Sequence, residues 1–281
     1  MCSSDLATKA TLVYPSMWVF EQDAWTAAWD ALPAYDQDLA KAQELLDASG
    51  VADQLGAVAA GKASLSAGLA LGLAFMTTGV AFKIAAVPFH YWTPDAYQGS
   101  PTPVTGYLSV GPKVGAFAVI IRLFLEALAP LQADWLPVFW VLAALTMTLG
   151  NVVALTQTNV KRMLAYSSIA HTGYMLVGIA AWASGERGGL DGVLYYGAAY
   201  TFMNLGAFAV IAALQKRPGV TSALDTFAGL GRREPILGIL MALFLLSLTG
   251  IPPTAGFFAK AYVILAAVQA GSWTKIGRAH V

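Results

Sequence analysis

Three lysines lie inside or near the middle of long apolar runs, where a positive charge is costly. They are Lys83, Lys113 and Lys260. A charged side chain at membrane depth usually pairs with another group, faces a wet cavity or takes part in transport. Burial disfavours the charged form of an amine, so a lysine in such a place can gain and lose a proton. A single lysine near a span end is more simply explained by an ammonium that reaches the interface, but three of them favour a site that moves protons or cations.

Prolines interrupt two of the same runs. Pro88 follows Lys83 and leaves the carbonyl of Ile84 without its usual helical partner, which bends or breaks a helix. Pro252 and Pro253 interrupt the run that carries the third lysine. Broken helices persist in lipid only where protein or a wet cavity covers the loose backbone. Two interrupted helices of opposite sense are typical of inverted-repeat transporters. Here Lys83 precedes the first break, whereas Lys260 follows the second. We therefore infer that the two broken helices contain similar features, but not that they are copies of one repeat.

His171 is a fourth candidate, since it stands among hydroxyls in the stretch Ser167–Tyr174. Histidine can relay protons because its usual pKa lies close to physiological pH. A histidine that only links two helices by a hydrogen bond is an equally good interpretation. Four aromatic residues further along are interpreted as packing and interfacial residues: Tyr195, Tyr196, Tyr200 and Phe202.

The composition indicates an all-α membrane protein with several spanning helices. Hydrophobic residues make up 57% of the chain and charged residues 11%, with a mean hydropathy of +0.61. Soluble domains carry roughly 25% charged residues, and the alternating pattern of a membrane barrel is absent. The net charge is zero, so no nucleic-acid-binding surface is indicated. The only cysteine is Cys2, and no nucleotide, flavin, iron–sulfur or metal-binding motif is found, so we predict no metal site and no cofactor bound by this chain.

Six apolar runs are each near the roughly 20 residues that a spanning helix needs. They cover residues 65–87, 104–128, 135–155, 163–182, 193–214 and 236–268. The first continues past its proline towards Trp92, and the last breaks at residues 250–256. The loops after the third and fifth runs carry basic residues: Lys161, Arg162, Lys216, Arg217, Arg232 and Arg233. By the positive-inside rule these loops, and the one after the first run, face the cytoplasm.

The chain divides into four parts on sequence. Residues 63–274 form the predicted transmembrane domain, and residues 7–62 are predicted to be an acidic, amphipathic region outside the bilayer. Residues 1–6 and 275–281 can be encoded by complementary DNA strings that resemble sequencing adapters. We therefore predict that both ends are artefacts that flank an internal fragment of a gene.

Three motifs resemble the antiporter-like membrane subunits of respiratory complex I, NADH–quinone oxidoreductase. The first is FKxxxVPFHxWTPDxYxGxPxPV at residues 82–104. The second is NVKRxLAYSSIAHxGY at residues 159–174, and the third is LSLxGIPPTAGFFxK at residues 246–260. They occur in the order of the family, and the resemblance covers about residues 65–272.

The resemblance implies a fold and a role for each lysine. The family has fourteen membrane helices in an antiporter-like bundle with two discontinuous helices, and this chain would hold the seventh to the twelfth. Lys83 would be the central lysine of the broken seventh helix, and Lys113 the connecting lysine of the eighth. Lys260 would be the lysine of the broken twelfth helix, near the exit half-channel. The glutamate that pairs with the central lysine stands on the family's fifth helix and would lie outside this sequence.

The implied function is redox-driven proton pumping along Lys113, His171 and Lys260, triggered by charge changes around Lys83. The chain would be a subunit of NADH:quinone oxidoreductase without a redox centre, in the bacterial plasma (inner) membrane. Its partners would be other membrane-arm subunits and lipid, with NADH, quinone, FMN and iron–sulfur clusters bound by other subunits. A subunit of a multi-subunit cation/proton antiporter is the alternative, because it shares the broken helices and lysines. A purely structural subunit is disfavoured, because filling the arm requires no buried cations.

Overall fold

The computed structural model describes residue 44 and residues 48–60 and 66–271. The chain forms two units, residues 1–60 and 61–281, and each is described by itself. The named element of the first unit is the short helix α3 (Val51–Ala59). The predicted artefacts at residues 1–6 and 275–281, most of the predicted external region and its boundary at residue 62 lie outside the described residues.

The second unit is built from helices. Their bounds in chain order are α4 (Ala67–Ile84), α5 (Trp92–Gly99), α6 (Thr102–Ile120), the π-helix η2 (Ile121–Ala127), the 3₁₀ helix η3 (Ala129–Leu131), α7 (Gln132–Ala154), α8 (Val160–Ala183), α9 (Gly188–Leu214), the 3₁₀ helix η4 (Leu224–Phe227), α10 (Leu230–Arg233), α11 (Pro235–Thr249) and α12 (Ala255–Gln269). No β-strand occurs among the described residues, and the all-α prediction is confirmed.

The six predicted spans correspond to these helices. Four stretches of the described chain are long and apolar enough to cross a membrane: 67–84, 102–127, 129–154 and 188–214. The fourth predicted span is α8, a helix of 24 residues that carries Lys161, Arg162 and His171. The last predicted span is divided between the shorter apolar helices α11 and α12. The chain therefore forms a multi-pass membrane bundle.

α8 and α9 form the centre of this bundle. α8 packs against α5, α7, α9 and α12, and α9 packs against α6, α11 and α12 as well. Small residues let α8 approach α7 closely: a Cβ added at Gly150 would lie 2.7 Å from the backbone nitrogen of Ala170. A Cβ added at Gly173 would lie 2.6 Å from the side chain of Met147. Close contact through small residues is a common way of packing membrane helices, and it fixes α8 against its neighbour.

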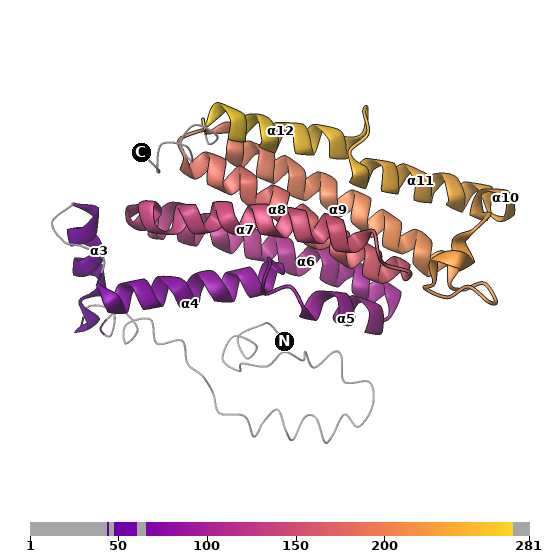
Figure 1. The fold of residues 1–281 in the computed structure, drawn as a ribbon, viewed down its shortest axis with the longest axis horizontal. Helices are drawn as coiled ribbons and strands as arrows, with labels where there is room; N and C mark the ends of the chain where they lie inside the picture. Colours follow the sequence, from indigo (N-terminus) through magenta and orange to yellow (C-terminus); the bar gives the residue numbers. More distant parts are fainter. Residues whose placement is uncertain (1–43, 45–47, 61–65, 272–281) are drawn as a thin grey trace, which may run out of the picture. The chain divides into compact units, whose positions relative to one another are not determined.

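The two broken spans run in opposite directions. In Figure 1 the chain passes from α4 to α5 in one direction and from α11 to α12 in the other. α4 packs on α6, whereas α12 packs on α8 and α9. The prediction that the interrupted helices have opposite senses is therefore confirmed.

The first break begins before its proline. α4 ends at Ile84, and Ala85 after it has a left-handed backbone with φ of 60°. The Ala86 N–H donates to the carbonyl of Ala81 at 2.8 Å, and the Ala85 N–H donates to that of Phe82 at 3.1 Å. This pair of bonds is the Schellman pattern, which satisfies carbonyls at the end of a helix. Pro88 follows three residues later, in the stretch between α4 and α5.

The second break has the same pattern. α11 ends at Thr249, and the φ of 88° at Gly250 after it lies in the left-handed region that favours glycine. The Ile251 N–H donates to the carbonyl of Leu246 at 3.2 Å, and the Gly250 N–H donates to that of Ser247 at 3.0 Å. Both breaks therefore use one local structure, with a proline three residues after the left-handed residue. The prolines predicted to mark the breaks all lie in them: Pro88, Pro252 and Pro253.

One end of the bundle gathers the loops that carry basic residues. The Val160 N–H, at the start of α8, donates to the carbonyl of Ser222 in the loop after α9 at 2.8 Å. Arg162 forms an ion pair with Asp95 of α5, with 2.5 Å between nitrogen and oxygen. The loops after the first, third and fifth predicted spans thus meet at one end, as predicted. Their cytoplasmic location stays a prediction.

The close approach of α12 to the end of α11 provides a test of this joint. A Cβ added at Gly256 would lie 1.7 Å from the carbonyl oxygen of Ser247. We expect Gly256→Ala to lower the free energy of unfolding by about 2 kcal/mol, because overpacking forces the backbone to shift. Gly197→Ala on α9 is the control, since a Cβ there meets nothing within 4 Å. Thermal unfolding in detergent compares the two variants, and equal melting temperatures would contradict this packing.

Candidate functional site

Lys113 lies inside the bundle on α6 and is only 3% exposed. Its Nζ donates to the carbonyl and the hydroxyl of Ser168, each at 2.6 Å, and to the hydroxyl of Thr172 at 2.9 Å. All three ammonium protons therefore have acceptors, and among the ion pairs found in the described residues none includes Lys113. A hydroxyl can donate as well as accept, so the same groups can also bond to a neutral amine. The site can hold Lys113 with or without its extra proton.

Thr172 joins Lys113 to the first helix break. Its hydroxyl donates to the carbonyl of Ile84 at 3.0 Å, the carbonyl that the proline leaves unpaired. On the other side of the break, the Val87 N–H donates to the hydroxyl of Thr146 at 3.0 Å. An unsatisfied buried carbonyl would cost about 1–3 kcal/mol, so these threonines stabilise the broken backbone. Protein side chains cover the break, as the sequence predicts.

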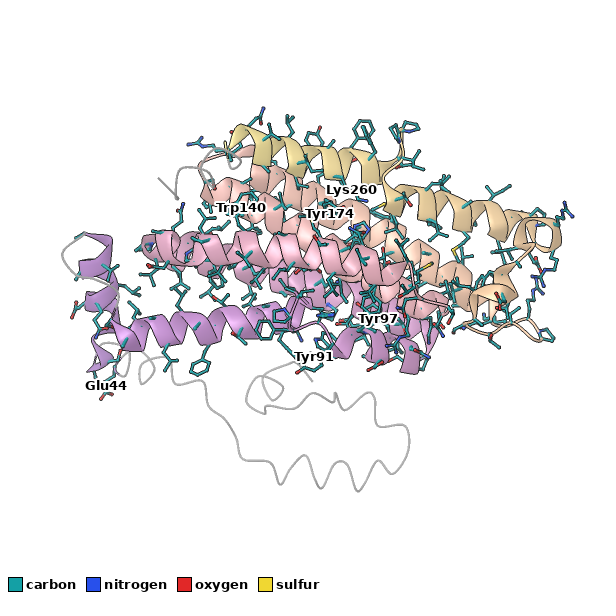
Figure 2. The ribbon with its side chains drawn as sticks, viewed as in Figure 1. Glu44, Tyr91, Tyr97, Trp140, Tyr174 and Lys260 are labelled. Carbon is teal, nitrogen blue, oxygen red and sulfur yellow. The ribbon has the colours of Figure 1, made fainter. Side chains whose placement is uncertain are left out.

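Lys260 lies at the second break and is half-buried. Its Nζ donates to the carbonyls of Leu248 and Thr249, at 2.9 and 2.8 Å. These carbonyls belong to the last turn of α11, where helical partners are missing and the helix dipole favours a cation. The same nitrogen lies 5.1 Å from the centre of the Tyr174 ring. Figure 2 shows Lys260 and Tyr174 close to the joint between α11 and α12.

His171 lies on α8 and is 3% exposed. Its Nδ1 is 2.6 Å from the hydroxyl oxygen of Tyr196, and its ring centre is 5.0 Å from that of Tyr200. The Tyr200 hydroxyl donates to the hydroxyl of Ser168 at 2.7 Å, next to Lys113. On the other side, the rings of Tyr196 and Tyr174 are stacked with 6.3 Å between centres. Tyrosines therefore connect His171 to the surroundings of both lysines.

We call this connected set of side chains the polar row. Its members are Lys113, Ser168, Thr172, Tyr200, His171, Tyr196, Tyr174 and Lys260. The polar row extends from the first helix break to the second through α6, α8, α9 and α12. It consists of amines, hydroxyls and one imidazole, and each of these groups can both give up and take up a hydrogen-bonded proton.

The structure brings together three of the four predicted residues: Lys113, His171 and Lys260. Lys83 lies outside the polar row, because its side chain is exposed on α4, which packs on α6. Among the described residues Lys113 is buried, Lys260 is half-buried and the Lys83 side chain is exposed on α4. The part of each lysine in proton transfer stays a prediction. The residue after Lys83, Ile84, is nevertheless bonded to the polar row through Thr172.

Sequence reasoning missed the roles of two tyrosines on α9. Tyr196 and Tyr200 are each 1% exposed, and their hydroxyls point to α8, whereas Tyr195 is 39% and Phe202 77% exposed. The packing and interfacial interpretation fits Tyr195 and Phe202 but is incomplete for the buried pair. A usable signal was present, since the four-residue spacing of the pair matches that of the polar residues 168 and 172.

Broken helices with in-membrane lysines define a class of antiporter-like membrane subunits. The chain matches the family described as "NADH:quinone oxidoreductase/Mrp antiporter, TM" over residues 45–279. The match covers most of the chain, so the chain belongs to this family.

The most similar proteins narrow this assignment. The NADH-quinone oxidoreductase subunit N of Trichlorobacter lovleyi is 53% identical over 203 residues, which cover 72% of this chain and 41% of that protein. The motif details also favour chain N of complex I, in agreement with this relative. The chain spans about two fifths of the length of such relatives, 41% in this case.

Two solved structures have the same fold. Respiratory complex I from Thermus thermophilus with bound Aureothin matches 78% of this chain and 48% of its own chain, at 36% identity and a TM-score of 0.59. The Mrp complex from Dietzia sp. matches 74% of this chain and 38% of its own chain, at 28% identity and a TM-score of 0.66. The prediction of an antiporter-like membrane bundle is therefore confirmed.

The bond between Thr172 and the first break can be tested by removing one hydroxyl. We expect Thr172→Val to lower the free energy of unfolding by about 1–3 kcal/mol, because it leaves the carbonyl of Ile84 unpaired. Thr201→Val is the control, since the Thr201 hydroxyl bonds only a carbonyl of its own helix, that of Gly197. Chemical or thermal unfolding in detergent measures both variants. A loss for Thr172→Val no larger than the control's would show that the hydroxyl does not support the break.

Proposed function

We propose that this chain is part of a proton-translocating membrane subunit of NADH–quinone oxidoreductase. The observation that supports it most is the polar row, which connects two lysines and a histidine across the bundle and ends at a helix break on each side. Membership of the family and the 53% identity with a subunit N support the assignment to this complex. The energy for pumping would come from quinone reduction in other subunits.

The polar row would carry protons by exchange between neighbours. Lys113 would pass a proton to the Ser168 hydroxyl, which would release its own proton to the Tyr200 oxygen once the Tyr200 hydroxyl has turned from donor to acceptor, so that no hydroxyl keeps a net charge. Tyr200 and His171 would continue the route, and Lys260 would take up the proton on the far side. Between Tyr200 and His171, and from Tyr196 through Tyr174 to Lys260, the residues are in ring contact, so these steps would require side chains to turn. One proton enters at Lys113 for each proton that leaves Lys260. Hydrogen-bond distances of 2.6–2.9 Å around Lys113 are short enough for the first transfer.

Lys83 would couple this route to charge changes elsewhere in the complex. It stands beside Ile84, whose carbonyl accepts from Thr172, the same hydroxyl that accepts from Lys113. If a nearby charge attracted the Lys83 ammonium and shifted the helix break, the hydrogen-bond acceptors available to Lys113 would therefore change. By resemblance, a glutamate of another helix supplies the opposite charge for Lys83.

The setting of the subunit follows from the same proposal. Its neighbours would be other membrane-arm subunits, in the bacterial plasma (inner) membrane, and it would act as part of a translocase. NADH, quinone, FMN and the iron–sulfur clusters would be bound by other subunits, and this chain would hold no redox centre and no metal. The assemblies to which the chain is similar include "Respiratory complex I from Thermus thermophilus with bound NADH".

A subunit of a multi-subunit cation/proton antiporter is the second candidate. The observation that favours it is the likeness to the Mrp complex from Dietzia sp., with a TM-score of 0.66. Sequence identity favours the first candidate: it is 28% to the Mrp complex and 53% to the subunit N of Trichlorobacter lovleyi.

The role of the lysines can be tested in the whole complex, reconstituted in sealed vesicles. We expect Lys113→Met to lower proton translocation roughly tenfold or more, since positioned acid–base groups contribute about 10²–10⁴-fold. Lys83→Ala should also cut it sharply, because it removes the charge that would couple the helix break to the rest of the complex. Lys216→Met is the control, because Lys216 is exposed in the loop after α9. An unchanged ratio of protons to electrons in both lysine variants would contradict the proposal.

The two candidate functions differ in what drives ion movement. We expect vesicles that contain the complex to take up protons only while NADH and quinone are supplied. A sodium or potassium gradient imposed without NADH and quinone should move no protons, as measured with a pH-sensitive dye. Cation-driven proton exchange under these conditions would favour the antiporter.

A further inference from the structure

We propose that Tyr196 is a positioning residue that holds the His171 ring in one orientation while that ring gains and loses a proton. The inference rests on the proposed function, because it assigns Tyr196 a part in the same proton route. It goes beyond the lysines and the histidine, since α9 supplies a group that takes up no net proton itself.

The geometry places Tyr196 as the partner of one particular nitrogen. Its hydroxyl oxygen is 2.6 Å from Nδ1 of His171, and both residues are buried, at 1% and 3% exposure. The Tyr196 ring meets the His171 ring edge-on at 63°, with 5.6 Å between centres. A bond to Nδ1 leaves Nε2 as the nitrogen that would gain and lose a proton.

A tyrosine hydroxyl suits a histidine that changes charge, because it can accept or donate at the same place. When Nδ1 carries hydrogen, it donates to the Tyr196 oxygen, and Nε2 can take up one proton to give the imidazolium. Loss of that proton from Nε2 restores the neutral ring with the bond at Nδ1 unchanged. When the neutral ring carries its hydrogen on Nε2 instead, the Tyr196 hydroxyl turns and donates to Nδ1. Tyr196 loses no proton in any of these states.

Other partners would not serve in the same way. A backbone carbonyl only accepts, so it would fix one tautomer of the neutral ring. A carboxylate would also accept only, and its charge would favour the imidazolium. Tyr196 therefore accommodates both neutral tautomers of His171 and the charged ring, without a turn of the imidazole.

Two neighbouring tyrosines limit the movement of both rings. Tyr174 stacks on Tyr196 with 19° between the ring planes. Tyr200 lies beside His171, with 5.0 Å between centres and 39° between planes. The hydroxyl of Tyr196 can therefore be removed while stacking still supports its ring, which makes phenylalanine an informative substitution.

The test uses the whole complex with Tyr196→Phe, reconstituted in sealed vesicles. We expect the ratio of protons translocated to electrons transferred to fall roughly tenfold in the share carried by this subunit. The reason is that the His171 ring loses the hydrogen bond at Nδ1 that fixes its orientation, so its Nε2 is no longer held in one place. The matched control is Tyr195→Phe, the next residue on α9, which is 39% exposed and contacts Tyr262 rather than the polar row. This control should translocate protons like the unmodified complex.

A double-mutant cycle distinguishes positioning from a general structural role. If Tyr196 acts through His171, Tyr196→Phe should cause no further loss in a complex that already carries His171→Gln. Losses that multiply in the double variant would show that the two residues act independently, and would overturn the inference. So would a Tyr196→Phe complex that translocates protons as well as the Tyr195→Phe control.

Replacement of the hydroxyl by other groups keeps the test decisive if Tyr196→Phe does not assemble. p-Aminophenylalanine at position 196 keeps both a donor and an acceptor, and should preserve translocation. p-Methoxyphenylalanine keeps the acceptor only, and the complex that carries it should lose part of its proton translocation. Equal translocation by the two would overturn the inference.

The His171→Gln complex separates this inference from the proposed function. If His171→Gln and Lys113→Met are both impaired but Tyr196→Phe is not, the positioning role alone is wrong. If His171→Gln and Lys113→Met both translocate protons normally, the proposed route is wrong, and the role of Tyr196 is overturned with it.

Discussion

A carbonyl group that loses its helical partner inside a membrane bundle must find another donor, and this constraint organises the whole structure. Each break in a spanning helix frees carbonyls where no water is at hand. At the first break Thr172 donates to Ile84, and at the second Lys260 donates to Leu248 and Thr249. The breaks thus explain why cations and hydroxyls occur in an apolar chain, and why they occur where they do.

The same bonds show how a cation can be held without a carboxylate. Lys113 and Lys260 donate to hydroxyls and carbonyls, whose partial charges stabilise an ammonium without neutralising it. An ion pair in the interior would hold the proton by the full attraction of an opposite charge. Neutral oxygens hold it less strongly, which suits groups that pass a proton on. The described ion pairs lie away from the polar row and include Arg122 with Glu126 on the outer surface.

Much of the fold follows from the sequence because its signals are strong and local. Long apolar runs, prolines and basic loops predict the spans, the two breaks and the shared end of the loops. The faces of α9 do not follow from its hydropathy, because this helix is apolar all round, and only the four-residue spacing of Tyr196 and Tyr200 signals the buried face. Tyr195 and Tyr196 are neighbours in sequence but lie about 100° apart around the helix, so one is exposed and the other is buried.

The exposure of Lys83 and the start of the first break were also beyond local reasoning. Burial of Lys83 depends on which helices cover α4, and its own sequence does not specify them. The turn begins at Ala85 rather than at Pro88, because the left-handed residue that ends a helix precedes the proline. At the second break a glycine marks the corresponding position, and the sequence shows it directly.

The glycine contacts between α7 and α8 bear on which movements of the bundle are fast and which are slow. Gly150 and Gly173 bring the two helices so close that even one added Cβ atom would collide with the neighbouring helix at either position. Side-chain rotations take picoseconds to nanoseconds, whereas shifts of whole helices take microseconds to milliseconds. Side-chain rotations along α8 therefore belong to the fast class, and they require no shift of the helix itself.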